Sequence, residues 1–399
     1  MQNAASSSGL RTVVVCMLAN NLTLGLIYGT FGAMLSSNEQ AFAVARDTIS
    51  FGMSAVATTT GLSALLMGKV VRRITPRIAI LIGTLSAAVA FGGLGLTTSI
   101  TVALAMWALL GFSAAMAAIL GPVAIAAEFF PAKSGKFLAM VNLPVVLFVS
   151  PWLVTAILPA LGRDGVYMAM ALCLLPISLL VLLALPKGTG TTAAPPPPRS
   201  GKPDQTMLSR ADFWLITLGI AVIAGTGTAF TVHAIPYAQA EGLSVSASAL
   251  MFSAYMGAGL VGVPFFGWLA DRIGAPRALA LSGLVQCLCW AGLGTMPPVA
   301  FVPIAALLGA ATTPLTTLHG AAMAQIFGAA RVGTAMGYSF AIKLPFLFVA
   351  APAVGYVYVK LVDYRPALLA VSATLVVAVI LLLIGGRLGR AMSARQVNA

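Results

Sequence analysis

The sequence predicts an all-α integral membrane protein with twelve transmembrane helices, arranged as two pseudo-symmetric bundles of six. Three observations support this fold class. Of the 399 residues, 60% are hydrophobic and 8% are charged, whereas a soluble domain has roughly 25% charged residues. Apolar runs long enough to cross a bilayer recur along the chain, and features of the first half return about 200 residues later. A soluble globular protein is therefore excluded.

The individual helices follow from the lengths of the apolar runs. A bilayer core about 30 Å thick requires roughly 20 apolar residues per helix. Transmembrane β-strands would show about ten residues of alternating polarity, and the runs in this chain are longer and do not alternate. The predicted spans are 12–35, 48–68, 78–97, 101–126, 137–159, 165–185, 212–237, 246–268, 278–295, 299–326, 333–359 and 366–386.

The two ends of the first bundle are also predicted. Arg11 precedes the first span and no small-residue cleavage site follows a short apolar core, so we expect this helix to remain in the mature protein. Residues 187–210 contain four consecutive prolines at 195–198 and several glycines. Such a composition favours an extended, mobile tether. It would join an N-terminal bundle, 1–186, to a C-terminal bundle, 211–399.

The charge distribution predicts the orientation of the helices. The chain has 22 Lys and Arg against 9 Asp and Glu, a net charge of +13. With the N-terminus inside, seventeen of the basic residues fall on the inner side and only Arg46, Arg163, Lys360 and Arg365 on the outer side. Basic residues concentrate on the cytoplasmic side of membrane proteins. We therefore expect both termini in the cytoplasm, in a bacterial inner membrane, and no nucleic-acid partner.

The sequence offers no motif for an enzyme, a nucleotide site or a metal site. All four cysteines lie in apolar runs, which favours buried side chains. No Gly-rich loop ends in Lys followed by Ser or Thr, so ATP hydrolysis is not expected as an energy source. We expect no catalytic residue, no metal and no cofactor. A receptor remains an alternative only if a ligand binds without net flux.

The halves of the chain align with an offset of 197 to 201 residues. The Leu-Leu-Gly sequence at 109–111 returns at 307–309, and a pair of prolines seven residues apart returns as Pro345 and Pro352. An even number of helices per half makes the repeats parallel, related by an axis along the membrane normal. Such repeats hold a substrate between them near the bilayer midplane.

A second repeated feature lies after the second and eighth predicted helices, at 68–77 and 267–277. The loop carries a Gly, a spacer, Asp followed by a basic residue, then a Gly and another basic residue. In these residues the chain resembles the major facilitator superfamily over its whole length. The first copy departs from the pattern, with Arg72 in place of the acid and Thr75 in place of the glycine. The resemblance implies a major facilitator fold and a conformational role for Gly267, Asp271, Arg272, Gly274, Arg277, Arg72 and Arg73.

Lys343 is the one basic residue inside a predicted span. Counted from about residue 333 at about 1.5 Å per residue, it lies roughly 15 Å deep, near the bilayer centre. A lysine there costs about 2.5–3.5 kcal/mol, and no Asp or Glu lies in the middle of a span to pair with it. We therefore expect Lys343 to face a central cavity, where an anionic substrate completes the pair. Hydrogen bonding to helix carbonyls is the alternative.

Several other polar residues in the spans are candidates for the same site. His233 and His319 are the ordinary proton acceptors within the predicted spans, and either one could carry a coupling proton. A structural, hydrogen-bonded histidine is the alternative at both positions. Hydrogen bonds to a carboxylate could come from Tyr28, Asn20, Asn21, Tyr237 and Tyr338.

The position of Lys343 in the eleventh helix, beside Pro345, is similar to that in the monocarboxylate and oxalate/formate transporter branches of the superfamily. The resemblance implies that this lysine holds a carboxylate. Those branches usually add an arginine in helix 8, but residues 252–266 carry no charge, and a single cation favours a monoanion. The function implied is secondary active transport of a small organic anion, a monocarboxylate, by alternating access, through proton symport or anion exchange. We expect a monomer in the lipid bilayer. The alternative is an exporter of an apolar or aromatic small molecule on the same fold.

Overall fold

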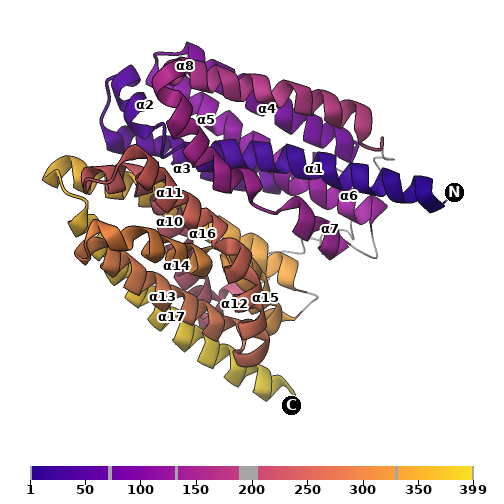
Figure 1. The fold of residues 1–399 in the computed structure, drawn as a ribbon. Helices are drawn as coiled ribbons and strands as arrows, with labels where there is room; N and C mark the ends of the chain where they lie inside the picture. Colours follow the sequence, from indigo (N-terminus) through magenta and orange to yellow (C-terminus); the bar gives the residue numbers. More distant parts are fainter. Residues whose placement is uncertain (1, 71–73, 131–133, 188–204, 329–330, 398–399) are drawn as a thin grey trace. The chain divides into compact units, whose positions relative to one another are not determined.

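The structure is a computed structural model that describes residues 2–70, 74–130, 134–187, 205–328 and 331–397 (Figure 1). These residues form α-helices joined by short connections, and the described part of the chain contains no β-strand. The chain divides into two compact units, Met1–Ala194 and Pro195–Ala399. The division falls inside the predicted linker, of which residues 188–204 lie outside the described residues.

Unit 1 contains the first six membrane-spanning segments. The fourth combines α5, a π-helical turn η1 and α6, whereas the fifth and sixth share α8, which is interrupted at Gly162. The elements are α1 (Gln2–Thr30), α2 (Leu35–Phe42), α3 (Arg46–Val70), α4 (Pro76–Leu96), α5 (Ile100–Ala114), η1 (Ala115–Leu120), α6 (Gly121–Phe129), α7 (Ser134–Val141) and α8 (Val145–Ala184).

Unit 2 contains the other six segments. Two of them are built from consecutive helices, α11 with α12 and α14 with α15. The elements are α9 (Gln205–Leu208), α10 (Ala211–Ala240), α11 (Val245–Gly257), α12 (Gly259–Ile273), α13 (Ala275–Thr295), a 3₁₀ turn η3 (Pro298–Ala300), α14 (Phe301–Thr312), α15 (Leu315–Phe327), α16 (Val332–Leu361) and α17 (Arg365–Val397).

The predicted twelve spans are confirmed, with changes at their ends. Ten stretches in the described ranges are long and apolar enough to cross a membrane. One of these is the whole of α8, which holds two spans, and α3 supplies the twelfth. The first span ends at Thr30 rather than at 35 and is followed by the separate short helix α2. The last helix runs on to Val397, past the predicted end at 386, because its polar final turns remain helical beyond the apolar run.

The turn between the two arms of α8 depends on Gly162 and its neighbour. Gly162 has φ +65° and ψ 176°, a backbone conformation that favours glycine. Arg163 stabilises the turn by two hydrogen bonds. Its Nε donates to Asn38 Oδ1 at 2.9 Å, and its Nη2 donates to the Leu94 carbonyl at 2.8 Å. The guanidinium also covers the Phe42 ring at 4.5 Å. One half-buried arginine therefore holds α2, α4 and α8 together.

The internal repeat reappears as matching helix contacts in the two units. A Cβ on Gly111 would overlap the Val56 carbonyl oxygen, and a Cβ on Gly309 would overlap the carbonyl oxygen of Tyr255. The repeat offset aligns Gly111 with Gly309 and Val56 with Tyr255, so the same contact occurs in both units. In the same way, Gly25 packs on Val146, and Gly225 packs on the backbone of Phe346. Glycine lets the helix backbones approach closely at these crossings, so the two units are packed on one plan.

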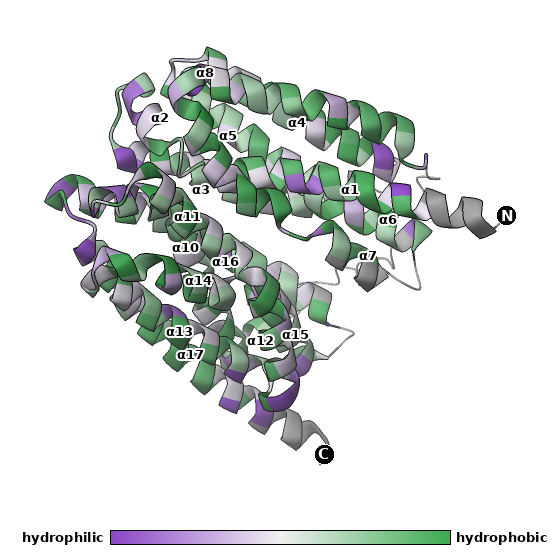
Figure 2. Cartoon of the chain, in the orientation of Figure 1, coloured by the Kyte–Doolittle hydropathy of each residue, from purple (hydrophilic) through white to green (hydrophobic). Residues whose placement is uncertain are grey.

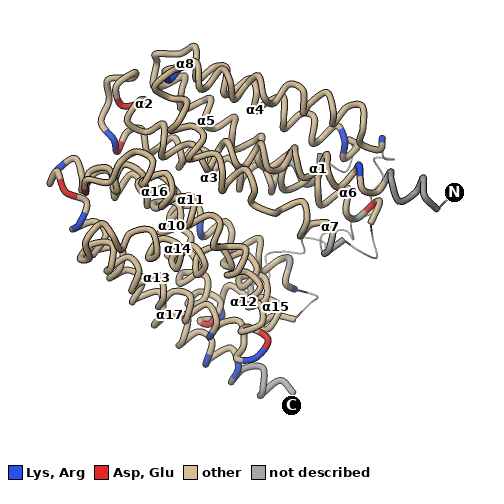
Figure 3. Tube along the Cα trace, viewed as in Figure 1, with Lys and Arg blue, Asp and Glu red and all other residues tan. Residues whose placement is uncertain are grey.

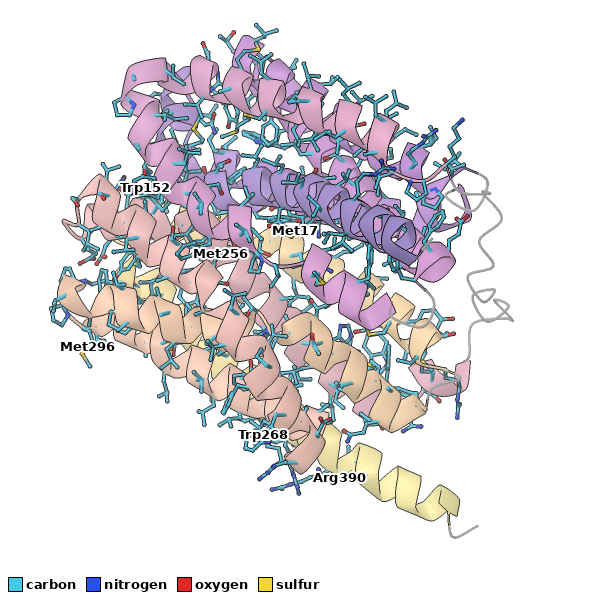
Figure 4. All side chains as sticks on the ribbon, turned by 45° about the vertical axis from the view of Figure 1, so that its right-hand side comes forward. Met17, Trp152, Met256, Trp268, Met296 and Arg390 are labelled. Carbon is cyan, nitrogen blue, oxygen red and sulfur yellow. The ribbon has the colours of Figure 1, made fainter. Side chains whose placement is uncertain are left out.

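The two units also share a distribution of polarity. Figure 2 shows hydrophobic residues along the helices and hydrophilic ones gathered at their ends, and Figure 3 shows the charged residues concentrated at those ends. In unit 2, Trp268 and Arg390 lie at one end of the helices and Met296 at the other (Figure 4). Helix ends are polar and helix middles apolar in proteins that span a bilayer. The chain is an integral multi-pass membrane protein.

Candidate functional site

Lys343 is buried near the middle of α16. Its side chain is 6% exposed. Four ion pairs in the described part of the chain join Glu39 with Arg46, Asp164 with Arg163, Asp212 with Arg210 and Glu241 with Arg365, so the carboxylates of these pairs are not partners of Lys343. A buried ammonium without a carboxylate is costly unless other groups accept hydrogen bonds from it. The partners of Lys343 therefore decide what this position can do.

The neighbours of Lys343 come from α15 and α16. Its Nζ lies 3.3 Å from His319 Nδ1 and 3.8 Å from the centre of the Phe340 ring. His319 Nε2 lies 2.8 Å from Ser339 Oγ, and both of these side chains are fully buried. We refer to these four residues as the Lys343 cluster. The spacing of residues 339, 340 and 343 places them on one face of α16, and α15 brings His319 against that face.

The contacts fix the tautomer of His319. An ammonium only donates hydrogen bonds, so Nδ1 must accept from Lys343. The ring proton of neutral His319 is then on Nε2, which donates to Ser339 Oγ at 2.8 Å. The cluster thus holds a cation by one neutral acceptor and one aromatic face. A cation over a ring is stabilised by the quadrupole of the ring.

Asn20 and Asn21 lie elsewhere, in unit 1, where they hold the break between α7 and α8. Asn20 Nδ2 donates to the Val141 carbonyl at 3.0 Å and to Asn142 Oδ1 at 2.7 Å. Asn21 Nδ2 donates to the same carbonyl at 3.2 Å, and its Oδ1 accepts from the Val145 amide at 2.9 Å. This break divides the predicted span 137–159, because Pro144 cannot donate to the helix. Both asparagines therefore donate within the unit, Asn20 in two hydrogen bonds and Asn21 in one.

Asn21→Ala is expected to lower the free energy of unfolding by about 2–4 kcal/mol, because it leaves buried amide and carbonyl groups at the start of α8 unpaired. The midpoint of thermal unfolding in detergent measures the effect. Asn142→Ala, which alters an exposed side chain at the same break, is expected to cost less. A weaker substrate affinity without a loss of stability would contradict this structural role and favour a substrate role for Asn21.

His233 and Tyr237 lie together near the end of α10. His233 Nε2 lies 2.8 Å from the Ala351 carbonyl and therefore donates to it, and its Nδ1 lies 3.2 Å from the Tyr364 hydroxyl. The Tyr237 hydroxyl donates to the Leu293 carbonyl, and its ring packs on Phe301 and Tyr364. Both side chains are buried and hydrogen-bonded within unit 2. These contacts join them to Ala351, Tyr364, Leu293 and Phe301 rather than to the residues of the Lys343 cluster.

The two remaining tyrosines are half-buried. Tyr28 on α1 interacts with the side chain of Thr60 on α3, and Tyr338 on α16 adjoins Ser339 in the sequence. The structure therefore brings together Lys343 and His319 of the eight predicted residues. It adds Ser339 and Phe340, which the sequence analysis missed. Their spacing of four and three residues from Lys343 on one helix was the available signal.

The repeated loop motif is described in its second copy, since Arg72 and Arg73 lie outside the described residues. Gly274 ends α12 with φ +88°, which explains the glycine of the motif. The Ala275 amide then donates to Gln325 Oε1 at 3.0 Å. Arg272 stacks on Trp268 at 4.4 Å, Gly267 is half-buried, and Asp271 and Arg277 are exposed. In the first copy, Thr75 occupies the place of the glycine and caps α4, accepting from the Ile78 amide at 3.4 Å.

Two similar six-helix units with matching internal contacts are typical of membrane transporters built from repeats. The family model of the Major Facilitator Superfamily matches residues 16–299 and 217–394. The chain belongs to the major facilitator superfamily, and it is a transporter rather than an enzyme.

Solved structures of transporters share the fold. The peptide transporter POT, in a mutant form, aligns with a TM-score of 0.76 and 12% identity, covering 96% of this chain and 95% of that chain. A mutant of the nucleoside transporter NupG aligns with a TM-score of 0.74 and 10% identity, covering 94% and 99%. NupG itself aligns with 0.72 and 11%, covering 95% and 98%. A comparison with curated proteins finds no match. These identities show a common fold alone.

Proposed function

We propose that the protein is a secondary active transporter of a small organic anion, a monocarboxylate, which it moves by alternating access with Lys343 as the charge partner. The observation that supports this function is the buried Lys343 ammonium, whose partners among the described residues are the neutral His319 and the face of Phe340. A carboxylate would give this cation a charge-assisted hydrogen bond, which is roughly twice as strong as a neutral one.

The geometry leaves room in the hydrogen bonding of Lys343 for such a substrate. An ammonium has three donors, and His319 takes one of them in the described contacts. A carboxylate has two acceptor oxygens, so it can accept from the ammonium directly. Transient pairing with an anion is a known use of buried cations within membrane spans.

The charge count favours a monoanion. The helix pair α11 and α12 carries no charged residue between 252 and 266, so Lys343 would meet the anion as a single positive charge. One carboxylate neutralises it, whereas a second carboxylate would remain unpaired in a region of low dielectric constant, which is costly. Short monocarboxylates are therefore the proposed substrates.

An apolar cavity in unit 2 favours a second candidate, the export of an apolar or aromatic molecule. The cavity has a volume of about 300 Å³ and lies between α10, α16 and α17. Gly225, Phe346, Val349, Ala353 and Ala370 are among its lining residues. Under this alternative Lys343 would have a structural role, satisfied by His319 and Phe340.

Uptake into proteoliposomes tests the proposed substrate class. Short radiolabelled monocarboxylates are compared with dicarboxylates and with neutral aromatic compounds, with and without an imposed pH gradient. We expect saturable uptake of monocarboxylates, and stimulation by the gradient if protons are carried along. Transport of the neutral aromatics with no transport of any carboxylate would reject the anion proposal in favour of the exporter. Liposomes without protein provide the background.

We also propose an orientation and a conformational role for the loop motif. The excess of basic residues on one side supports cytoplasmic termini in a bacterial inner membrane, with residues 187–210 as the tether between bundles 1–186 and 211–399. The loop residues Gly267, Asp271, Arg272, Gly274 and Arg277 are proposed to act in the conformational change of a monomeric carrier. Labelling of single cysteines placed near either terminus in intact cells tests the orientation.

A further inference from the structure

The Lys343 cluster supplies the buried cation with partners from its own unit. His319 accepts from the ammonium at 3.3 Å, and Phe340 presents its ring at 3.8 Å. Both partners are neutral side chains of the protein itself, so the ammonium has them as partners even when no substrate is bound. This matters for a carrier that has to change orientation after it has released its substrate.

An alternating-access carrier returns either loaded or unloaded. If its binding cation has neither a hydrogen-bond acceptor nor an aromatic face in the unloaded form, the return leaves an unsatisfied ammonium buried in a region of low dielectric constant, which is unfavourable. Such a carrier is restricted to exchange, because only the loaded form can change orientation. A carrier whose cation has an internal partner can return without substrate and therefore performs net transport.

We propose that His319 and Phe340 are positioning residues that take the place of the carboxylate on Lys343 when substrate is not bound, so that the unloaded carrier can reorient. The inference rests on the proposed transport of a monocarboxylate. The inference favours net transport over obligatory exchange. The sequence alone does not distinguish these two modes.

The neutrality of His319 suits it to this task. A carboxylate binds an ammonium more strongly than a neutral ring nitrogen does, so the substrate becomes the main partner of Lys343 through the donors that His319 leaves free. Ser339 contributes by accepting from Nε2 at 2.8 Å, which keeps the lone pair of Nδ1 directed at Lys343. An aspartate at position 319 would instead form a permanent ion pair and compete with the substrate.

The test compares two flux modes in the same proteoliposomes, loaded with a radiolabelled short monocarboxylate. Net efflux is measured into buffer without carboxylate, and exchange is measured into buffer that contains it. In His319→Leu, we expect the ratio of net efflux to exchange to fall about tenfold or more, the factor that corresponds to one hydrogen bond to a charged group. Exchange is expected to fall by a much smaller factor than net efflux, because the loaded carrier pairs Lys343 with substrate.

His319→Asn is the matched variant, because its side-chain oxygen can accept in place of Nδ1. Its flux ratio is expected to remain close to that of the wild type. Phe340→Leu, which removes the ring from the ammonium, is expected to lower the ratio by a smaller factor, and it decides the question if His319→Leu does not fold. A merely structural defect would slow both modes together.

The inference is overturned if His319→Leu keeps the wild-type ratio, or if it folds and loses both modes equally. If His319→Leu does not fold, an unchanged ratio in Phe340→Leu overturns it. Failure of the proposed function looks different: the wild-type protein itself then moves no carboxylate in either mode, before any variant is made.

Discussion

Lys343→Gln is expected to lower kcat/KM for carboxylate transport by at least about 100-fold, since removing one partner of a buried charge pair costs about 3–5 kcal/mol. The glutamine amide can still donate to His319 Nδ1, so the substitution removes the charge while it retains a hydrogen-bond donor. We therefore expect the protein to stay folded, with a thermal unfolding midpoint equal to or above that of the wild type. The midpoint does not fall because the substitution removes a desolvated cation, which destabilises the helix bundle.

Initial uptake rates over a range of carboxylate concentrations measure this effect, beside thermal unfolding of the same samples. Lys360→Gln is the matched control, because Lys360 is an exposed lysine at the end of the same helix. It is expected to transport at the wild-type rate. Lys343→Arg keeps the charge but changes its shape, since a planar guanidinium does not replace an ammonium at a close contact. Full activity of Lys343→Gln would assign Lys343 a structural role and support the apolar exporter.

Gly309→Ala is expected to lower the free energy of unfolding by about 3 kcal/mol or more, the upper range for overpacking in a closely packed interior. The new Cβ would overlap the backbone carbonyl of Tyr255, and backbone cannot move aside as the end of a flexible side chain can. α11 and α14 would have to separate. The aligned position in unit 1, Gly111, faces the Val56 carbonyl in the same way, so Gly111→Ala is expected to have an effect of similar size.

Thermal unfolding in detergent measures both glycine variants. Gly337→Ala on α16 is the matched control, because no described atom would lie within 4 Å of its Cβ. It is expected to be neutral or to stabilise by about 0.5–1 kcal/mol through the higher helix propensity of alanine. If Gly309→Ala unfolds at the same temperature as this control, the close crossing of α11 and α14 does not limit the stability of unit 2.

The fold could be predicted from the sequence because the bilayer imposes a length on each apolar run. The spans and the twofold repeat follow from that constraint and from the returning prolines and glycines. The short helix α2 and the break between α7 and α8 could not be predicted in the same way. Both involve contacts between segments far apart in the sequence, those of Arg163 with α2 and of Asn21 with α8, and a hydropathy profile does not detect such contacts.

The candidate site was predictable in part. The depth of Lys343 follows from counting residues along one helix. Its partner His319 lies on the preceding helix, so their contact depends on how α15 packs on α16, which a single sequence does not specify. The buried asparagines were ambiguous for a physical reason: the same amide can bind a substrate or satisfy backbone groups near Pro144. In the structure both amides are put to the second use, since each donates to the Val141 carbonyl.

The repeat position that carries Lys343 in unit 2 carries Asn142 in unit 1. The helix is broken at this position in unit 1 and continuous in unit 2. The fifth span of unit 1 is jointed, because the helix stops at Val141 and starts again at Val145. Its counterpart α16 is one continuous rod from Val332 to Leu361, even though it contains Pro345 and Pro352. A displacement of Lys343 is therefore expected to move α16 as one element, from Val332 to Leu361. In unit 1, α7 and α8 are separate helices, and the hydrogen bonds of Asn20 and Asn21 to Val141 and Val145 tie both of them to α1 at the break.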